Sequence, residues 1–322
     1  MDDQKERPVC PECKGTDVIS YGFSWRCKSC GRKFNKFYRS KKTFEQFDNY
    51  DLERYNFCPR LTGDWLLIGD AHVPFHCPET STYAVEMAKK WGIRKVVSVG
   101  DTFELESFKK YLDSHPGVNW KYEKSSGVKF LSVLIDNFDE IQLLIGNHEL
   151  RFWKKMEAVN DQDDVFQFFV KDSKVKTSIY PFCVINESWL LCHPHSYSRI
   201  AARNPYFLAS KHLVSLIEAG NSPNGQYGLV AYHGHGGGEG TDISSRFQVA
   251  DGMGLFEPQL FNYYVKKMNT APAWRKGFMI LRNNYLYRFP FSTTDWDFWL
   301  GSSGNEKAKS KPSKAKRVGL HP

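Results

Sequence analysis

The sequence predicts an α/β domain that follows a small N-terminal module held together by metal. Apolar runs of strand length alternate with helical patterns through most of the 322 residues, which is typical of buried sheets covered by helices. The N-terminal region differs, because it holds two Cys-x-x-Cys pairs and too little apolar sequence for a core of its own. The apolar fraction of 41% and the charged fraction of 25% are those of an ordinary globular protein.

Four cysteines near the N-terminus predict a structural zinc site. Cys10 and Cys13 form one pair, Cys27 and Cys30 form the other, and thirteen residues separate the two pairs. Two such pairs surround one ion with four thiolates, the tetrahedral arrangement that zinc prefers. Because the intervening residues alternate in polarity around a glycine, we expect a short hairpin. The pattern resembles the zinc ribbons of transposases and transcription factors, and we assign it to residues 1–38.

Basic and aromatic side chains are interleaved in this module and in the segment that follows it. The cations are Arg26, Lys28, Arg32, Lys33, Lys36, Arg39, Lys41 and Lys42, and the rings are Trp25, Phe34, Phe37 and Tyr38. Cations that neutralise phosphates beside rings that stack on bases favour a nucleic-acid surface. The alternative is a protein-docking module whose rings pack on its own hairpin. We expect residues 39–62 to form a basic, aromatic linker to the main domain.

The net charge of +8 is concentrated at the two ends of the chain. Residues 1–42 carry a net charge of +6, residues 301–322 carry +5, and the remainder carries −3. A near-neutral body with two basic ends is typical of an enzyme that holds a polyanion, although basic ends can also serve solubility alone. The stretch NEKAKSKPSKAKR has nothing apolar to bury, so we expect the tail 301–322 to be disordered.

Five apolar runs of the main domain have the character of β-strands, and helical patterns lie between them. The predicted strands are 65–69, 95–99, 141–145, 182–192 and 229–232. The predicted helices are 79–91, 125–138 and 205–219. The polar stretch 158–178 is predicted to form a helix and a connector. Residues 276–291 are predicted to form a closing hairpin that turns at Asn283-Asn284.

Each of these five runs is followed by residues that can bind metal. In chain order they are Asp70 and His72, Asp101 and Glu104, Asn147 and His148, His193 and His195, and His233 and His235. The carboxyl ends of strands in an α/β sheet lie along one edge, so we expect these side chains to converge. A single histidine at such a place would be an ordinary core or surface residue. Five strand ends in register indicate a metal site.

The types and the number of these ligands favour two catalytic ions. Carboxylate, amide and imidazole groups without thiolate suit Mn, Fe, Zn or Ni better than Ca or Mg. Seven of these residues are candidate ligands: Asp70, His72, Asp101, Asn147, His193, His233 and His235. One catalytic ion does not take so many protein ligands. Two ions about 3.5–4 Å apart clamp both oxygens of a phosphoryl displacement and produce hydroxide at neutral pH. We therefore expect two divalent ions, with Mn as the first choice, and an acid such as Asp101 to bridge them.

Taken together, the five motifs resemble those of the calcineurin-like metallophosphoesterases. They are Asp-x-His, Gly-Asp-x-x-acid, Gly-Asn-His-Glu, a strand-end His, and a His-Gly-His pair. The resemblance covers about residues 63–290 and implies a two-sheet sandwich flanked by helices, in a domain that we place at 63–300. GDTFE lacks the Asp-Arg-Gly continuation of the Ser/Thr protein phosphatases, which counts against that branch.

The resemblance also implies a role for each ligand position. Asp70, His72 and His235 would bind one ion, and Asp101 would bridge to the other. The ligands of the second ion would be Asn147, His193 and His233. The catalytic residue His148 would lie over the phosphate, where it would stabilise charge or protonate the leaving oxygen.

The sequence leaves the roles of three further positions undecided. Glu104 stands where the family usually has Asp, and we expect it to support a metal ligand without binding metal itself. His193 directly follows its strand and is preferred as the ligand to His195, which remains a candidate for substrate or for ligand support. Arg151, two positions after GNHE, could reach a phosphate oxygen or could lie on a helix surface.

The expected function is metal-dependent hydrolysis of phosphodiesters. The preferred hypothesis is a nuclease that acts on DNA or RNA, with the ribbon helping to hold the nucleic acid. One alternative is a phosphatase of small nucleotides or phosphoproteins with the ribbon as a docking module. Another is a nucleic-acid-binding adaptor with a structural phosphoesterase body, but the complete ligand set argues against it. Without a membrane-length apolar run or a signal peptide, we expect no membrane partner and a cytoplasmic location in a bacterial or phage-infected cell. The oligomeric state does not follow from the sequence.

Overall fold

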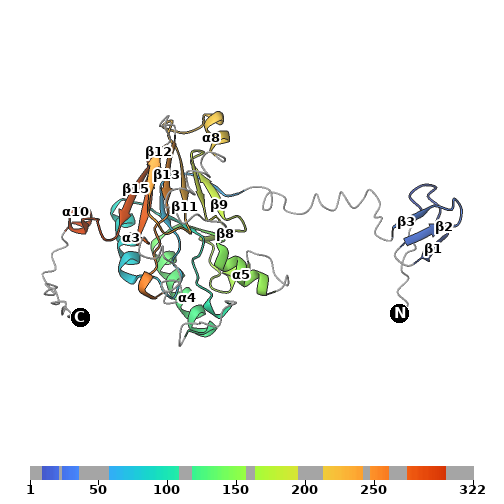
Figure 1. Ribbon diagram of the computed structural model, residues 1–322, viewed down its shortest axis with the longest axis horizontal. Coiled ribbons are helices and arrows are strands. Elements are labelled where there is room, and N and C mark those ends of the chain that lie inside the picture. The colour runs from blue at the N-terminus through green and yellow to red at the C-terminus, as the bar shows by residue number, and fades with distance from the viewer. Residues whose placement is uncertain are drawn as a thin grey trace, which may run out of the picture. The chain divides into compact units, whose positions relative to one another are not determined.

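The computed structural model describes two compact units, Met1–Phe57 and Cys58–Pro322, and each unit is considered by itself (Figure 1). The described residues are 9–21, 24–35, 58–108, 118–156, 164–194, 213–241, 247–260 and 274–301. The predictions for His195, for most of the linker and for the tail therefore lie outside the described residues.

The first unit is a three-stranded antiparallel sheet. Its strands are β1 (Val18–Tyr21), β2 (Ser24–Cys27) and β3 (Lys33–Asn35), with β2 in the middle. Its buried residues are Cys10, Val18, Cys27 and Phe34. So small a core agrees with a fold that depends on its cysteine cluster.

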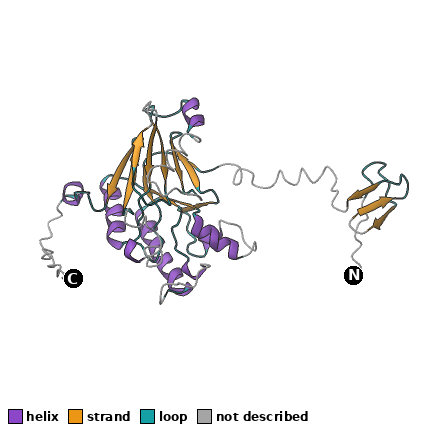
Figure 2. Cartoon of the chain, viewed as in Figure 1, coloured by secondary structure: helices purple, strands orange, loops and turns teal. Residues whose placement is uncertain are grey.

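The second unit is a sandwich of two six-stranded mixed sheets flanked by helices (Figure 2). The first sheet has the order β15-β14-β5-β6-β7-β8. Its strands are β5 (Trp65–Ile68), β6 (Lys95–Val99), β7 (Glu140–Leu144), β8 (Val175–Ser178), β14 (Gly277–Arg282) and β15 (Tyr285–Pro290). β5 to β8 are parallel, and the hairpin of β14 and β15 adds to β5 in the antiparallel direction.

The second sheet has the order β12-β13-β11-β10-β9-β4. Its strands are β4 (Arg60–Leu61), β9 (Phe182–Ile185), β10 (Trp189–Cys192), β11 (Tyr227–Ala231), β12 (Glu239–Thr241) and β13 (Phe247–Asp251). β10, β11 and β13 are parallel, while β9 and β12 pair with their neighbours β10 and β13 in the antiparallel direction. Both sheets therefore have a parallel centre, whose strand ends can carry a site.

Alternation along each strand divides the side chains between two cores. In β5, Trp65 and Leu67 pack between the sheets, against the fully buried Trp189 of the second sheet. Leu66 and Ile68 point the other way and pack under the helices. A strand buried on both faces reads as a continuous apolar run, which is why the central strands are visible in the sequence.

Three helices cover the outer face of the first sheet: α3 (Pro78–Lys90), α4 (Trp120–Asn137) and α5 (Asn147–Lys155). The shorter helices are η1 (Glu106–Phe108), α6 (Asp164–Gln167), α8 (Val214–Ala219), η2 (Pro258–Leu260) and α10 (Trp296–Leu300). Within the described stretches, no helix has both the length and the apolar character required to cross a membrane.

The α/β two-sheet fold is confirmed, but some predicted elements differ in detail. The run 182–192 is a hairpin of two strands, because Asn186 and Glu187 both adopt left-handed backbone angles, φ 52° and 52°, and turn the chain. Helix α4 begins earlier than residue 125, because the Asn119 side chain caps it by accepting a hydrogen bond from the Tyr122 amide at 3.1 Å. The polar edge strand β8 lies where a connector was expected.

Candidate dinuclear metal centre

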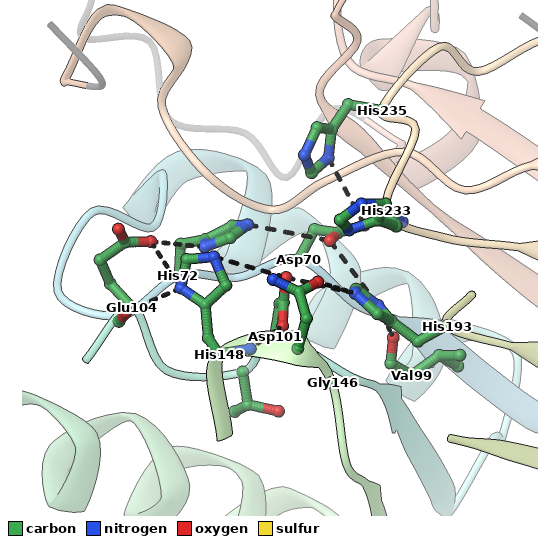
Figure 3. A network of polar contacts seen from close by, with 12 residues as sticks. Asp70, His72, Val99, Asp101, Glu104, Gly146, His148, His193, His233 and His235 are labelled. Atoms are coloured by element: carbon green, nitrogen blue, oxygen red, sulfur yellow. Dashed lines mark hydrogen bonds and ion pairs between the residues drawn. The ribbon is translucent and has the colours of Figure 1, made fainter. Parts of the chain in front are cut away.

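The predicted ligands meet at the carboxyl ends of five strands from both sheets (Figure 3). β5, β6 and β7 of the first sheet and β10 and β11 of the second each lead directly into one or two of them. The residues brought together are Asp70, His72, Asp101, Asn147, His193, His233 and His235. The convergence follows from the parallel direction of these strands within each sheet.

The ligand atoms form two groups with Asp101 between them. Asp70, His72 and His235 each offer a ligand atom within 4.8 Å of the other two, and so do Asp101, His193 and His233. Asp101 also forms a group with His72 and His148. It is therefore near ligands of both groups, where a bridging carboxylate has to be.

On two of the histidines, an acceptor holds one ring nitrogen and the other nitrogen faces the ligand groups. The Nδ1 of His193 donates to the Val99 carbonyl at 3.0 Å, so its Nε2 faces Asn147 Oδ1 at 3.0 Å and Asp101 Oδ2 at 3.2 Å. The Nδ1 of His72 donates to Glu104 Oε2 at 2.6 Å, so its Nε2 points at Asp70. This pattern is typical of metal-ligating histidines, whose second nitrogen is held by an acceptor.

The backbone at the ligand positions adopts an uncommon conformation. Left-handed φ angles occur at Asp70 (46°), His72 (47°), Asp101 (48°), His233 (74°) and His235 (54°). Each such residue costs roughly 1–2 kcal/mol, and residues of this kind cluster at functional sites. Sharp turns immediately after the strands aim these side chains back over the sheet edge.

The donor atoms present fit bound cations. Asp70 Oδ1 and His235 Nδ1 are buried and have no hydrogen-bond partner among the described residues. Burial lowers the pKa of His233 to about 4, which leaves its ring neutral and able to bind metal at neutral pH. His235 Nδ1 does lie 3.5 Å from Asp70 Oδ2, at ion-pair distance. Buried polar atoms normally form hydrogen bonds, so two buried ligand atoms without one in the same site point to an ion.

The charge of the site also fits cations. Burial would raise the pKa of Asp70, but the positive charge of His235 outweighs it and lowers that pKa to about 2. The pKa of Asp101 likewise lies well below its usual range, because the charge of His148 and other histidines outweighs burial. Burial lowers the pKa of His193, yet the charge of Asp101 raises it to about 9. A proton on His193 thus supplies charge that a metal ion would replace.

His148 lies beside the ligands with one nitrogen held and one directed into the site. Its Nδ1 donates to the Glu104 carbonyl at 2.7 Å, so Nε2 is the atom that can exchange a proton with a substrate. Its ring centroid is 4.7 Å from that of His72, edge to face. The Glu104 carboxylate also lies 3.3 Å from His148 Nδ1, so Glu104 supports His72 and His148 together.

Arg151 lies on the same face of α5 as Asn147, one helical turn later. Burial, with the positive charges of His72 and Arg151 adding to it, lowers the pKa of His148 to about 4. The guanidinium is therefore close enough to the site to act on it electrostatically. This position is compatible both with a contact to a phosphate oxygen and with a place on the helix surface.

Glu149 has a structural role that the sequence alone did not indicate. Its carboxylate accepts hydrogen bonds from the backbone amides of Asp101 (3.1 Å), Phe103 (2.9 Å) and Gly146 (3.0 Å). Burial, followed by the charge of Asp101, raises the pKa of this carboxyl to about 7. Glu149 thus clamps the loop after β6 to the start of α5.

Gly146 permits the closest approach within the centre, and its substitution is a test of that packing. We expect Gly146→Ala to destabilise the fold by about 1–3 kcal/mol and to lower kcat about a hundredfold, because its Cβ would overlap the amide nitrogen and Oδ1 of Asp101. Thermal unfolding and hydrolysis of bis-p-nitrophenyl phosphate measure the two effects. Gly240→Ala is the matched control, since its Cβ would meet only Val249 Cγ2 at 3.8 Å. If the two variants have the same stability and the same kcat, the close contact between Gly146 and Asp101 is not important for the centre.

The four cysteines of the first unit form a second, separate ligand cluster. One Sγ from each of Cys10, Cys13, Cys27 and Cys30 lies within 4.8 Å of the others. The Sγ atoms of Cys13 and Cys27 are 3.5 Å apart, and those of Cys10 and Cys30 are 3.7 Å apart. Four thiolates at such spacing fit one tetrahedral zinc ion.

The sequence matches no protein-family model and no curated protein. Similar solved structures include the phosphoesterase YfcE from E. coli, at 15% identity over 69% of this chain and 90% of that chain, with a TM-score of 0.35. A dimetal phosphatase from Danio rerio has 10% identity over 71% and 95%, with a TM-score of 0.35. A Vps29 single mutant from Entamoeba histolytica has 12% identity over 71% and 99%, with a TM-score of 0.33.

Identities and TM-scores this low do not by themselves determine a fold, so we base the assignment on the order and direction of the strands. Two mixed sheets pack face to face, their parallel centres end at one edge, and the buried His/Asp groups lie there. This is the arrangement that the sequence motifs predict. The body of the chain is an α/β sandwich of two mixed sheets with buried His/Asp groups at one edge, and the other unit is a small three-stranded sheet with a four-cysteine cluster.

Proposed function

We propose that this chain is a metal-dependent phosphodiester hydrolase and, more specifically, a nuclease acting on DNA or RNA. The observation that supports this most strongly is the pair of buried three-ligand groups with Asp101 between them. Two bound divalent ions would supply Lewis acidity to the phosphoryl oxygens and activate water at neutral pH. Mn is the first choice, and Fe, Zn or Ni suit the same donor set.

The protein's own groups have distinct tasks in this proposal. Asn147, at the start of α5, is half-buried and borders the site on the side of His193. Arg151, one turn later, neutralises a phosphate oxygen and orients the scissile group. His148 exchanges a proton at Nε2 with the leaving oxygen, while the Glu104 carbonyl holds its ring through Nδ1.

The first unit offers a surface that suits a phosphate backbone. Strand register places Ile19, Arg26 and Lys33 side by side across the three strands. All three are exposed, on the face opposite the buried Val18 and Phe34. Two cations on adjacent strands can each neutralise a phosphate, which supports a role of the ribbon in holding nucleic acid.

One experiment tests catalysis and substrate together. The full chain with Mn²⁺ is incubated with end-labelled single- and double-stranded DNA and RNA, beside His148→Ala. We expect cleavage by wild type and a loss of about 10²- to 10⁴-fold in His148→Ala, with both ions still bound. If the protein hydrolyses bis-p-nitrophenyl phosphate but cleaves no nucleic acid, the proposed phosphoesterase activity stands and the proposed nuclease activity is wrong. Small nucleotides and phosphoproteins would then be the substrates to test.

The same assay examines the ribbon through a charge-reversed variant, Arg26→Glu/Lys33→Glu. If both cations contact phosphates, the slope of log affinity against log salt for single strands should fall by about 1.4. Lys121→Glu/Lys124→Glu changes the net charge equally at two exposed positions of α4 and serves as the matched control. Equal slopes for the two variants would show that only overall charge matters and would remove the ribbon from the proposal.

A further inference from the structure

An aromatic cluster borders one of the two ligand groups. The ring of Phe256 lies 4.6 Å from that of His235 and 5.6 Å from that of His72. The ring of Trp274 lies 5.1 Å from that of His235 and 5.5 Å from that of Phe256. Phe75 packs in the same cluster. The cluster therefore extends outward from the metal ligands.

The residues of this region differ in their exposure to solvent. Phe75 and Phe256 are buried, whereas Trp274 is half-buried. The His235 side chain is 12% exposed, compared with 0% for His193. His235 is thus one of the partly exposed residues of the centre, together with His233 and Asn147, and the partly exposed Trp274 lies beside it.

The backbone around Trp274 is held in place from two directions. The next residue, Arg275, donates its amide hydrogen to the His235 carbonyl at 2.8 Å and accepts at its own carbonyl from Gly254 at 3.1 Å. Strand β14 begins at Gly277, whose amide donates to the Gly254 carbonyl at 3.1 Å. Trp274 is therefore tied to the same loop that carries His235, and its ring is positioned before any substrate arrives.

We propose that Trp274 stacks on the base beside the scissile phosphate and selects single-stranded nucleic acid as the substrate of this centre. The inference rests on the proposed function and adds a specificity-determining residue to it. Trp65 and Trp189 pack inside the sandwich and are fully buried, whereas Trp274 is partly exposed and its ring lies 5.1 Å from that of the metal-ligand candidate His235. A partly exposed indole at this position can offer a π-face to a base, whatever the base is.

The order of the rings suits the shape of a nucleotide. His148, His72, His235 and Trp274 form a chain in which each ring neighbours the next, at 4.7, 5.7 and 5.1 Å. A nucleotide carries its phosphate and its base on opposite sides of the sugar. With the phosphate held at the ligand groups beside His148, the sugar and the base extend past His235 towards Trp274.

Stacking on Trp274 requires a base that is free to leave its neighbours. In a duplex, unpairing and unstacking that base costs a few kcal/mol before any contact is gained. In a single strand the same movement is nearly free. Arg275, which follows Trp274 in the chain, is exposed and adds positive charge to this region, which favours a phosphate backbone.

The test pairs protein variants with base deletions in the full-length chain. Wild type, Trp274→Ala and Trp274→Phe are assayed with Mn²⁺ on a short single-stranded oligonucleotide and on copies with one abasic residue at each position in turn. We expect kcat/KM of wild type to fall roughly 5- to 100-fold when the abasic residue takes the stacked position. Trp274→Ala should lose the same factor on the intact strand and nothing more on the abasic one, while Trp274→Phe retains most activity.

Binding provides a readout that does not depend on turnover. The same oligonucleotides are titrated by fluorescence anisotropy against Asp101→Asn and Asp101→Asn/Trp274→Ala chains, and the same pattern of losses should appear in Kd. Trp299→Ala is the matched control, because Trp299 is also half-buried and packs on Trp91 and Phe289 away from the ligand groups. It should leave kcat/KM and Kd unchanged.

Several results would overturn the inference. If Trp274→Ala cleaves and binds intact and abasic strands as wild type does, Trp274 does not stack, although the hydrolase stands. If duplex is cleaved as fast as single strands, or if Trp299→Ala has the same effect, the specificity role is wrong. If wild type cleaves no oligonucleotide at all, the nuclease proposal fails first and this inference fails with it.

Discussion

Asp101→Asn is expected to lose roughly a thousandfold or more in kcat and to bind fewer than two divalent ions per chain. Asp101 groups with residues of both sets, so in the proposed centre its negative charge would hold two cations close together. Its Oδ1 also accepts a hydrogen bond from the His148 amide at 2.9 Å. An amide side chain has one oxygen and no charge, and it can serve only one of these partners.

Metal content by mass spectrometry and hydrolysis of bis-p-nitrophenyl phosphate measure this effect in the same preparations. Asp136→Asn is the matched control, because it makes the same chemical change at an exposed position of α4. We expect wild-type metal content and turnover in the control. A fully active Asp101→Asn protein with two bound ions would falsify the bridging role.

Removal of the ribbon's metal is expected to unfold the first unit and leave the second intact. Cys27→Ser removes one of four thiolates, and a structural zinc site contributes about 10–16 kcal/mol to the folding of so small a module. The few buried side chains of the first unit cannot replace that contribution. The cores of the second unit contain no residue of the ribbon, so its unfolding temperature should not change.

Zinc content and amide hydrogen exchange at residues 9–35 measure the loss of the ribbon fold, and calorimetry measures the stability of the body. Cys58→Ser is the matched control, since Cys58 is a half-buried thiol outside the cluster. It should keep one zinc ion and protected ribbon amides. If Cys27→Ser keeps both as well, the four-cysteine site is not what holds the ribbon together.

The sequence by itself determined the α/β class, the central strands and the ligands that the structure brings together. Strands buried on both faces must be apolar throughout, so β5, β6 and β7 are visible as short runs. Parallel strands end at one edge, so Asp70 and His235 could be expected to meet although they are distant in the chain. The cysteine spacing likewise predicted the cluster of the first unit.

Strands and turns that depend on contacts with other parts of the fold could not be predicted from the sequence. The polar β8 is a strand only because β7 provides a partner at the sheet edge. β9 and β10 separate where two left-handed residues turn the chain, a conformation that Asn186 and Glu187 adopt in this context. Local propensity is weak at such places, and tertiary pairing decides the outcome.

Only the tertiary structure decided how the site is supported. The clamp of Glu149 on the Asp101 loop, the Glu104 contact to both His72 and His148, and the place of Trp274 all depend on contacts between distant positions. Periodicity and spacing describe neighbours within one strand or helix, and they carry no information on which side chain packs against which across the fold. The candidate ligands follow strand ends and could be predicted, whereas their supports and the position of Trp274 follow packing, which exists only in the folded chain.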